Sequence, residues 1–297
     1  MLTLMAAVLP LTFCSCANAS GSKNKSGETA AASAAAMETP AKRKVNAKPY
    51  RLQIVNEFPH DVTSYTQGLF FYKGQMYEST GMNGLSTFRR VDIASGKPTF
   101  RLDFDRKYFL EGSVEKDGNI YILTWMNNVA FVYDAETLEY KASYAYPREG
   151  WGITTDGKEL IASDGSSKLF FMNDRFQTQR TVTVRLNGRA LTGLNELEYI
   201  DGKVWANVYL TDMIVIIDPS DGAVTGVIDC SGLLPDELRT PDTDVLNGIA
   251  YNPVDGKIYL TGKNWCRLYE VKAPDDASLI PSTATGPTST AADSRQP

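Results

Sequence analysis

A pattern of apolar strand, glycine-ended turn and second strand occurs five times along this chain of 297 residues. It constrains the fold more than any other feature. The turn glycines are Gly74, Gly118, Gly157, Gly202 and Gly256. They lie 44, 39, 45 and 54 residues apart, within or close to the length of one β-propeller blade. The repeat therefore predicts an all-β chain folded as a five-bladed β-propeller.

The segment before the first repeat predicts how the propeller closes. Residues 50–58, YRLQIVNEF, have the composition of a strand, whereas the fifth repeat lacks a fourth strand. A propeller whose first strand joins its last blade hides two sheet edges. We therefore expect residues 50–58 to complete blade five, and we expect the closed ring to be a monomer.

Four aspartates recur in the turns between the third and fourth strands of the repeats. They are Asp92, Asp134, Asp174 and Asp218. Aspartate in a turn commonly accepts hydrogen bonds from backbone N–H groups a few residues further on. We expect these residues to stabilise turns and assign them no part in function.

Two further repeat positions carry mixed polar and aromatic residues. Just before the first strand of each repeat stand Gln67, Glu111, Trp151, Asn195 and Asn247. Seven residues after each turn glycine stand Gly81, Trp125, Asp164, Tyr209 and Lys263. The first strands of propeller blades line the central axis, so these residues should converge there. A position kept only for packing would be uniformly apolar, so the mixture predicts a binding site.

The two ends of the chain differ in composition from the repeats. Residues 2–16 form an apolar run typical of a secretory signal, and residues 1–19 are expected to be either a cleaved signal peptide or a lipoprotein signal with Cys16 as the lipid-modified residue. Residues 20–48 resemble a flexible linker, residues 49–272 the propeller, and residues 273–297 a disordered tail. The expected location is the periplasm of a bacterium or, through a lipid anchor, its envelope.

Composition excludes some classes of function. The net charge of −5 and the pI near 5.1 provide no basic surface for nucleic acid. The single histidine, His60, cannot supply a histidine-based zinc site, and its place outside the repeat favours a structural role. Cys230 and Cys266 follow the first repeat, and the sequence leaves open whether they form a disulfide.

Several motifs resemble those of the glutamine cyclotransferase family, the plant and bacterial type of glutaminyl-peptide cyclotransferase. The segments are SYTQGL, YESTGMNGLS, EGWGITTDG, ASDGS, LNELEYIDGKVWAN, LNGIAY and TGKNW, and the resemblance covers about residues 55–271. It implies a five-bladed propeller that converts the amino-terminal glutamine of peptides and proteins to pyroglutamate and releases ammonia. It also implies catalysis without a metal or other cofactor.

The resemblance assigns roles to particular residues. Glu111 matches the glutamate that the family uses for proton transfer, and five other residues fall in motifs that surround the substrate: Gln67, Trp125, Trp151, Asn195 and Lys263. The sequence departs from the family pattern at Leu110, at Ser113 and Val114, and at Cys266. Leu110 stands beside the key glutamate, so we expect it to affect the pocket wall and efficiency more than the type of reaction.

The residue types fit this chemistry. Glu111 can deprotonate the attacking amine and then protonate the departing ammonia, and desolvation near the axis should raise its pKa. Lys263 and Asn195 can donate hydrogen bonds to the developing oxyanion. We expect Gln67 and Asn247 to bind the substrate backbone, Trp125 and Trp151 to enclose its apolar stem, and Asp164 to hold Lys263 or the ammonium group. Gln67 and Asn195 have the alternative role of capping strand ends at the axis.

Two other classes of protein remain as alternatives. One is a non-catalytic envelope propeller that binds peptides or glycans, with a degenerate site. The other is a metal-dependent propeller hydrolase, which would need several acidic ligands at the axis. Only Glu111 and Asp164 are acidic at the two converging positions, which disfavours the hydrolase.

Overall fold

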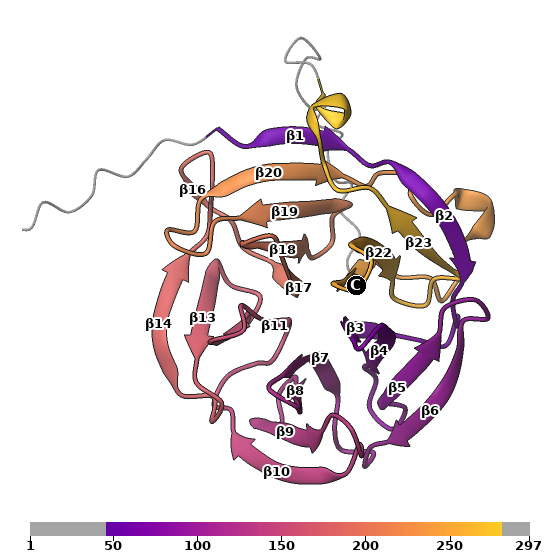
Figure 1. Ribbon diagram of the computed structural model, residues 1–297, viewed down its shortest axis with the longest axis vertical. Helices are drawn as coiled ribbons and strands as arrows, with labels where there is room; N and C mark the ends of the chain where they lie inside the picture. Colours follow the sequence, from indigo (N-terminus) through magenta and orange to yellow (C-terminus); the bar gives the residue numbers. More distant parts are fainter. Residues whose placement is uncertain (1–45, 281–297) are drawn as a thin grey trace, which may run out of the picture. The chain divides into compact units, whose positions relative to one another are not determined.

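The computed structural model describes residues 46–280, which fold as five sheets arranged radially around a central axis (Figure 1). The first strand of each sheet lies nearest the axis, and the fourth lies at the periphery. The predicted five-bladed propeller is confirmed. The predicted signal segment, residues 1–19, and the predicted linker as far as residue 45 lie outside the described residues.

Each blade is built from four consecutive antiparallel strands, apart from the last. Blade one contains β3 (Thr66–Tyr72), β4 (Gln75–Thr80), β5 (Thr87–Asp92) and β6 (Lys97–Asp103). Blade two contains β7 (Leu110–Lys116), β8 (Asn119–Thr124), β9 (Val129–Asp134) and β10 (Tyr140–Ala145). Blade three contains β11 (Ile153–Thr155), β12 (Leu160–Ala162), β13 (Lys168–Met172) and β14 (Thr178–Thr183). Blade four contains β17 (Leu194–Ile200), β18 (Lys203–Val208), β19 (Met213–Ile217) and β20 (Val224–Asp229).

Blade five contains β21 (Leu246–Asn252), β22 (Lys257–Gly262), β23 (Arg267–Val271) and, from the other end of the chain, β2 (Ile54–Pro59). A two-stranded hairpin, β15 (Arg185–Leu186) and β16 (Arg189–Ala190), lies between blades three and four in the sequence. The two helical elements are single 3-10 turns, η1 (Asp236–Leu238) and η2 (Asp276–Ser278). None of the helices within residues 46–280 is long and apolar enough to cross a membrane.

The repeated glycines fix the inner hairpins. Gly74, Gly118 and Gly202 have φ angles of 74°, 74° and 77°, and the residue before each of them also has a positive φ. Two consecutive residues with positive φ form a type I′ turn, which matches the right-handed twist of the strands it joins. These turns set the register in which the inner strands of blades one, two and four face the axis.

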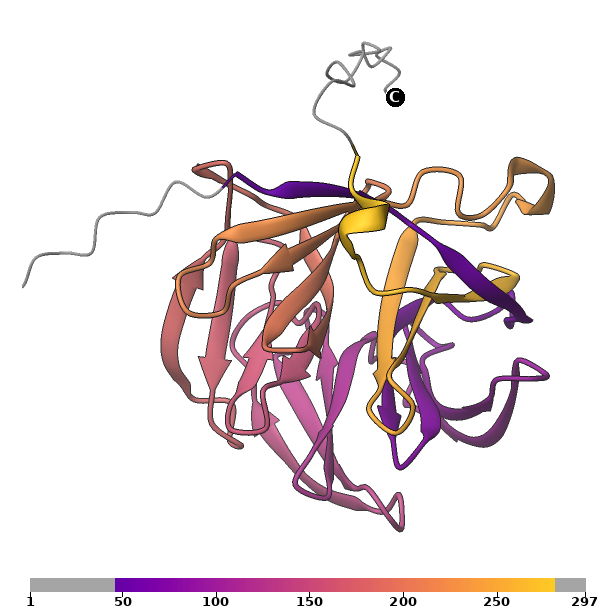
Figure 2. The ribbon, with the colours of Figure 1, turned by 45° about the horizontal axis from the view of Figure 1, so that its top comes forward.

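The ring is closed by β2, which pairs antiparallel with β23 from Ile54 opposite Val271 to Pro59 opposite Arg267. The predicted single strand over residues 50–58 is in fact two strands. Residues 50 and 51 belong to β1 (Lys48–Arg51), which pairs parallel with β20 on blade four. Figure 2 shows β1 and β2 running in succession past blades four and five. Tyr50 and Leu52 pack against the core between these blades, which explains why the chain crosses from one to the other.

The chain remains on the propeller after β23. Asp275 and Ser278 form a capping box around η2, Leu279 forms a β-bridge with Tyr50, and the backbone N–H of Ile280 donates to the carbonyl of Pro49 at 2.9 Å. The disordered tail predicted from residue 273 therefore begins too early. Residues 281–297 lie outside the described part.

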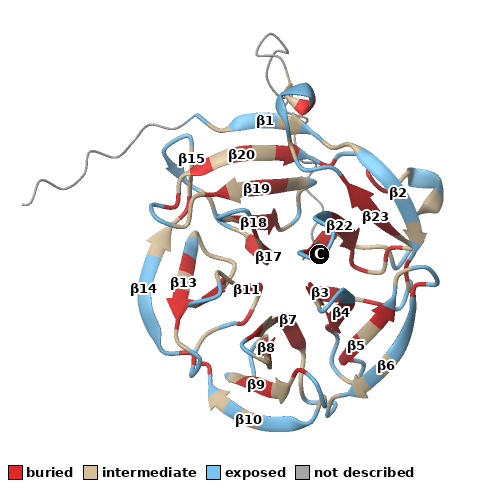
Figure 3. Cartoon of the chain, viewed as in Figure 1, coloured by how far each residue is buried: buried red, intermediate tan, exposed pale blue. Residues whose placement is uncertain are grey.

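The core lies between neighbouring blades. Inner strands such as β3 and β7 are almost wholly buried, whereas outer strands such as β6 and β10 alternate between exposed and half-buried residues (Figure 3). At the axis the inner strands approach one another closely. A Cβ atom on Gly152 would lie 2.1 Å from the carbonyl oxygen of Asn195, and one on Gly112 would lie 2.7 Å from the backbone nitrogen of Ile153. Glycine is thus required for the contact that brings Glu111, Trp151 and Asn195 together.

Three of the four turn aspartates have the predicted role. Asp92, Asp134 and Asp218 each accept a backbone N–H from two or three residues further on. Asp174 does not, because Asn173 occupies the equivalent position and accepts from the backbone of Arg175 at 3.0 Å. Asp174 instead forms an ion pair with Lys116 at 3.0 Å. The prediction for Asp174 was wrong by one residue in register.

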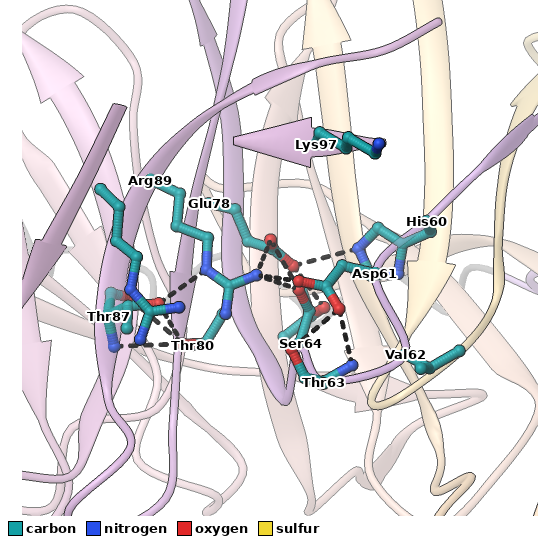
Figure 4. Close-up of polar contacts among 12 residues, drawn as sticks. His60, Asp61, Val62, Thr63, Ser64, Glu78, Thr80, Thr87, Arg89 and Lys97 are labelled. Carbon is teal, nitrogen blue, oxygen red and sulfur yellow. Dashed lines mark hydrogen bonds and ion pairs between the residues drawn. The ribbon is translucent and has the colours of Figure 1, made fainter. Parts of the chain in front are cut away.

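A buried polar network joins the closing segment to blade one (Figure 4). His60 Nε2 lies 3.1 Å from Glu78 Oε1, and its Nδ1 lies 2.9 Å from the carbonyl oxygen of Trp265. Glu78 also accepts hydrogen bonds from the hydroxyl groups of Ser64 and Thr66 at 3.1 and 2.7 Å. His60 therefore connects blade five to blade one, as its predicted structural role requires.

The two cysteines of the propeller are both free thiols. Cys230 is buried and Cys266 is half-buried. The pairing that the sequence left open is therefore absent from residues 46–280.

Candidate active site

A cavity of about 290 Å³ opens at the axis, where the loops between second and third strands meet the connections between blades. Its lining consists of Tyr65, Gln67, Phe109, Glu111, Trp125, Glu149, Trp151, Asn195, Tyr209 and Lys263. Six of the eight predicted site residues are among them: Gln67, Glu111, Trp125, Trp151, Asn195 and Lys263. Every blade contributes at least one lining residue, so the assembled ring is what creates the site.

Glu111 is a carboxyl group buried within this cavity, with 5% of its surface exposed. Gln67 Nε2 donates to Glu111 Oε1 at 3.1 Å, and the hydroxyl of Ser79 donates to the Glu111 carbonyl at 2.6 Å. Burial raises the pKa of Glu111 well above its ordinary value, Lys263 opposes the shift, and Glu149 adds to it. A carboxyl group with a raised pKa can both accept and return a proton near neutral pH.

Lys263 is the cation of the cavity and is 3% exposed. Its Nζ lies 4.7 Å from the ring centroid of Tyr65 and 5.3 Å from that of Tyr209. Burial lowers the pKa of Lys263, while the charges of Glu111 and Asp244 partly restore it. The two aromatic rings hold the ammonium group where it can reach a developing negative charge.

Asn195 offers a free amide to the cavity. The residue is 2% exposed, and within residues 46–280 its side chain forms no hydrogen bond with another protein group. Its backbone is fixed, because the hydroxyl of Ser163 donates to the Asn195 carbonyl at 2.8 Å. A buried amide with unused donors is suited to bind a polar group of a ligand.

Asn247 lies behind Gln67 and not on the cavity wall. Its Nδ2 donates to the carbonyl of Thr66 at 2.9 Å and to Gln67 Oε1 at 3.3 Å. This arrangement points Nε2 of Gln67 toward Glu111. It differs from the prediction that Asn247 binds the substrate directly.

Asp164 also lies outside the lining. Its Oδ1 accepts from the backbone N–H of Ser166 at 3.1 Å and from the hydroxyl of the same residue at 2.5 Å. The carboxylates that influence Lys263 are Glu111 and Asp244. The predicted contact between Asp164 and Lys263 is therefore replaced by a local turn.

Three lining residues were not predicted: Tyr65, Phe109 and Glu149. They share one position, two residues before Gln67, Glu111 and Trp151 respectively. In blades one and two the carbonyl at this position accepts from the backbone N–H of Gly81 or Trp125, at 2.8 and 3.0 Å. Comparing the repeats at this third position, besides the two used above, identifies these residues from the sequence. Tyr209 stands seven residues after its turn glycine, at the second of those two positions, and the sequence predicts no specific role for it.

Of the residues that depart from the family pattern, Leu110, Val114 and Cys266 pack in or against the core, and the hydroxyl of Ser113 donates to that of Ser79 at 2.9 Å. Leu110 is fully buried in the cluster between blades one and two, with Phe70 and Phe88. It does not line the cavity, contrary to the prediction that it shapes the pocket wall. Cys266 packs against the core between blades four and five, next to Trp265.

Acidic and metal-binding side chains are sparse around the cavity. Its only carboxylates within residues 46–280 are Glu111 and Glu149. In the same part of the chain, no three side chains of histidine, cysteine, aspartate or glutamate lie close enough together to hold a metal ion.

Comparisons with known proteins show the family to which the chain belongs. A family model described as glutamine cyclotransferase matches residues 28–273. The chain is 40% identical over 228 residues to a glutaminyl-peptide cyclotransferase of Arabidopsis thaliana, covering 74% of this chain and 71% of that protein. The crystal structure of Myxococcus xanthus glutaminyl cyclase superposes with a TM-score of 0.73 at 32% identity, covering 80% of this chain and all of that one. By sequence and by structure, the chain belongs to the glutamine cyclotransferase family.

Proposed function

We propose that this protein is a glutaminyl-peptide cyclotransferase that converts the amino-terminal glutamine of peptides or proteins to pyroglutamate and releases ammonia. The observation that carries the proposal is Glu111, a buried carboxyl group of raised pKa. It lies in one cavity with the amides of Gln67 and Asn195 and the ammonium group of Lys263. The names of the two relatives above support the same reaction.

The reaction needs proton transfer and a bent substrate. The α-amino nitrogen attacks the side-chain amide carbon of the same residue, so the reacting groups are already tethered. Ionised Glu111 takes a proton from the attacking nitrogen as the new C–N bond forms. The protonated carboxyl group then gives a proton to the amide nitrogen, the old C–N bond breaks, and ammonia leaves.

The other cavity residues stabilise this path. Lys263 and the amide of Asn195 can donate to the amide oxygen as it becomes negative. Gln67 holds one oxygen of Glu111, which leaves the other free for the substrate amine. The rings of Trp125 and Trp151 form apolar walls for the methylene groups of the glutamine side chain.

We propose that the reaction requires no metal or other cofactor. The test is to incubate the protein with a glutamine-initiated peptide, with and without a chelator, and to follow the loss of ammonia by mass. The expected product forms equally in both samples and disappears in Glu111→Gln, which keeps the shape of the side chain but cannot accept the proton. Product no faster than spontaneous cyclisation would instead support a binding module for peptides or glycans. Loss of activity with the chelator would support a metal-dependent enzyme.

The cellular location is a separate proposal. We infer export to the bacterial periplasm or anchoring in the envelope as a lipoprotein, because residues 2–16 form an apolar run that ends at Cys16. Intact mass of the protein from the membrane fraction distinguishes a lipid-modified Cys16 from cleavage after residue 19. We also infer a monomer, since a closed ring has no free edge for pairing.

A further inference from the structure

The walls of the cavity form a nearly continuous collar of aromatic rings. Tyr65 packs edge to face on Phe109 with ring centroids 6.2 Å apart, and Phe109 packs in the same way on Trp125 at 5.6 Å. On the other side, Trp151 packs edge to face on Tyr209 at 5.4 Å. Lys263 joins the two ends of this series, because its ammonium group lies over both Tyr65 and Tyr209. The collar is interrupted only between the two tryptophans.

Glu149 closes this interruption. Its Oε2 atom accepts from Nε1 of Trp125 at 2.9 Å and from Nε1 of Trp151 at 3.2 Å. The two indoles belong to different parts of the ring, since Trp125 follows β8 of blade two and Trp151 precedes β11 of blade three. One carboxylate oxygen of Glu149 thus connects the indoles of two neighbouring blades, through hydrogen bonds strengthened by its charge.

The backbone holds Glu149 in this position although its side chain is exposed. The N–H of Gly150 donates to the carbonyls of both Thr124 and Trp125 at 3.1 Å, and a Cβ on Gly150 would lie 2.5 Å from the Thr124 carbonyl oxygen. The preceding side chain, Arg148, is directed elsewhere, with its guanidinium 4.0 Å from the ring centroid of Phe170. The carboxylate therefore stays between the indoles without a competing cation from the adjacent residue.

We propose that Glu149 is a positioning residue for cyclisation: it fixes the indoles of Trp125 and Trp151 so that the glutamine side chain is held in its bent form against Glu111. This role rests on the proposed function. The stem of glutamine is flexible, and a misplacement of the reacting atoms by about 1 Å can cost about 100-fold in rate. Indole rings that are free to rotate would not hold the substrate in the bent geometry.

Indole resonances test the structural part of the proposal without reference to activity. The chain has four tryptophans, so a nitrogen-15 spectrum of the full chain should show four indole N–H signals. In Glu149→Ala the signals of Trp125 and Trp151 should shift and exchange faster with solvent. Trp265, whose indole donates to the Asp244 carbonyl at 2.9 Å, should stay unchanged. Single tryptophan-to-phenylalanine variants assign the signals.

Kinetics test the functional part. In Glu149→Ala, kcat/KM for a glutamine-initiated peptide should fall about 10- to 100-fold, as expected for misplaced binding walls. Glu149→Gln should recover part of the loss, because its amide oxygen can still accept an indole N–H. Glu139→Ala is the matched control, since Glu139 is exposed on the outer side of blade two and outside the cavity. Its kcat/KM should equal that of the wild type.

The pH profile separates positioning from general loss of stability. The charged or titratable groups that influence or face Glu111 are Lys263, Glu149 and Tyr65. Because Glu149 helps to raise the pKa of Glu111, removal of its charge in Glu149→Gln should lower that pKa. The acid limb of kcat/KM, where Glu111 becomes ionised, should move to lower pH.

Two outcomes would overturn the proposal. One is unchanged indole signals of Trp125 and Trp151 in Glu149→Ala. The other is wild-type kcat/KM in both Glu149 variants while the signals move. If the wild type and the Glu139→Ala control both lack cyclase activity, the proposed function is refuted. The indole spectra do not depend on activity, so this failure is distinguished from a failure of the positioning role.

Discussion

At the scale of single residues, Glu111 and Lys263 each shift the pKa of the other. Both are buried, and burial disfavours the charged form of each. The positive charge of Lys263 lowers the pKa of Glu111, and the negative charge of Glu111 raises that of Lys263. Removing either partner should therefore be visible in the titration of the other.

Replacement of the lysine tests this coupling. In Lys263→Met, kcat should fall about 100- to 1000-fold, as for the loss of one oxyanion donor. The pKa of Glu111 should rise further, because the charge that opposes its upward shift is gone. The acid limb of the pH profile should then move to higher pH, opposite to the shift expected for Glu149→Gln. Equal profiles for the two variants would contradict the assigned electrostatics.

The sequence predicted most of the cavity because the repeat places equivalent residues at the axis. Repeat position alone does not give the direction of a side chain. Gly248, which follows Asn247, has a φ of 121°. The glycines at the equivalent position of blades one to three do not have a positive φ: Gly68, Gly112 and Gly152. The backbone of blade five therefore differs at the position where the side chain of Asn247 lies behind Gln67. Asp164 lies outside the cavity lining because its Asp-Gly-Ser sequence forms a local turn, with hydrogen bonds from Ser166 to its carboxylate.

At the scale of elements, β1 and β2 have different tasks although they follow one another. The pairing of β2 with β23 closes the ring, while β1 covers the outer edge of blade four. The sequence alone does not distinguish the two strands, because both are short and contain polar and apolar residues. A strand-like sequence also does not indicate which other strand it pairs with. What sequence could predict was the missing fourth strand of blade five.

Two truncations distinguish these tasks. Removing the chain through residue 59, and with it both strands, should lower the unfolding temperature by about 10 °C or more, since several kcal/mol of edge pairing and packing are lost. Removing only the chain through residue 51 should have a smaller effect, because the ring stays closed. Thermal unfolding followed by circular dichroism makes the comparison. Equal losses would show that β2 alone does not close the propeller.

At the scale of the whole molecule, the junction between the first and last blades depends on the buried pair of His60 and Glu78. Burial lowers the pKa of His60, but Glu78 and the Trp265 carbonyl outweigh this and raise it above 6.5. Burial likewise raises the pKa of Glu78, but His60 and Arg89 bring it below 4.5. Each group thus stabilises the ionised form of the other inside the protein.

The pair should make stability depend on pH. The contribution of His60 is complete below 6.5 and is lost as pH rises through its folded pKa, and that of Glu78 is complete above 4.5 and is lost as pH falls through its folded pKa. The difference in unfolding temperature between the wild type and His60→Gln should therefore be largest between these values. Unfolding measured across pH 4 to 9 checks this. A difference that does not vary with pH would mean that His60 acts only as a neutral hydrogen-bonding group.

The bridge between Leu279 and Tyr50 places the two ends of the described chain side by side, away from the axis. Residues 46 and 280 could be joined by a short peptide linker, and new termini opened in an outer hairpin such as the one between β9 and β10. Such a circular permutant should keep the same hub of side chains. The order in which the blades are synthesised would change, while the catalytic geometry would be built from the same neighbours.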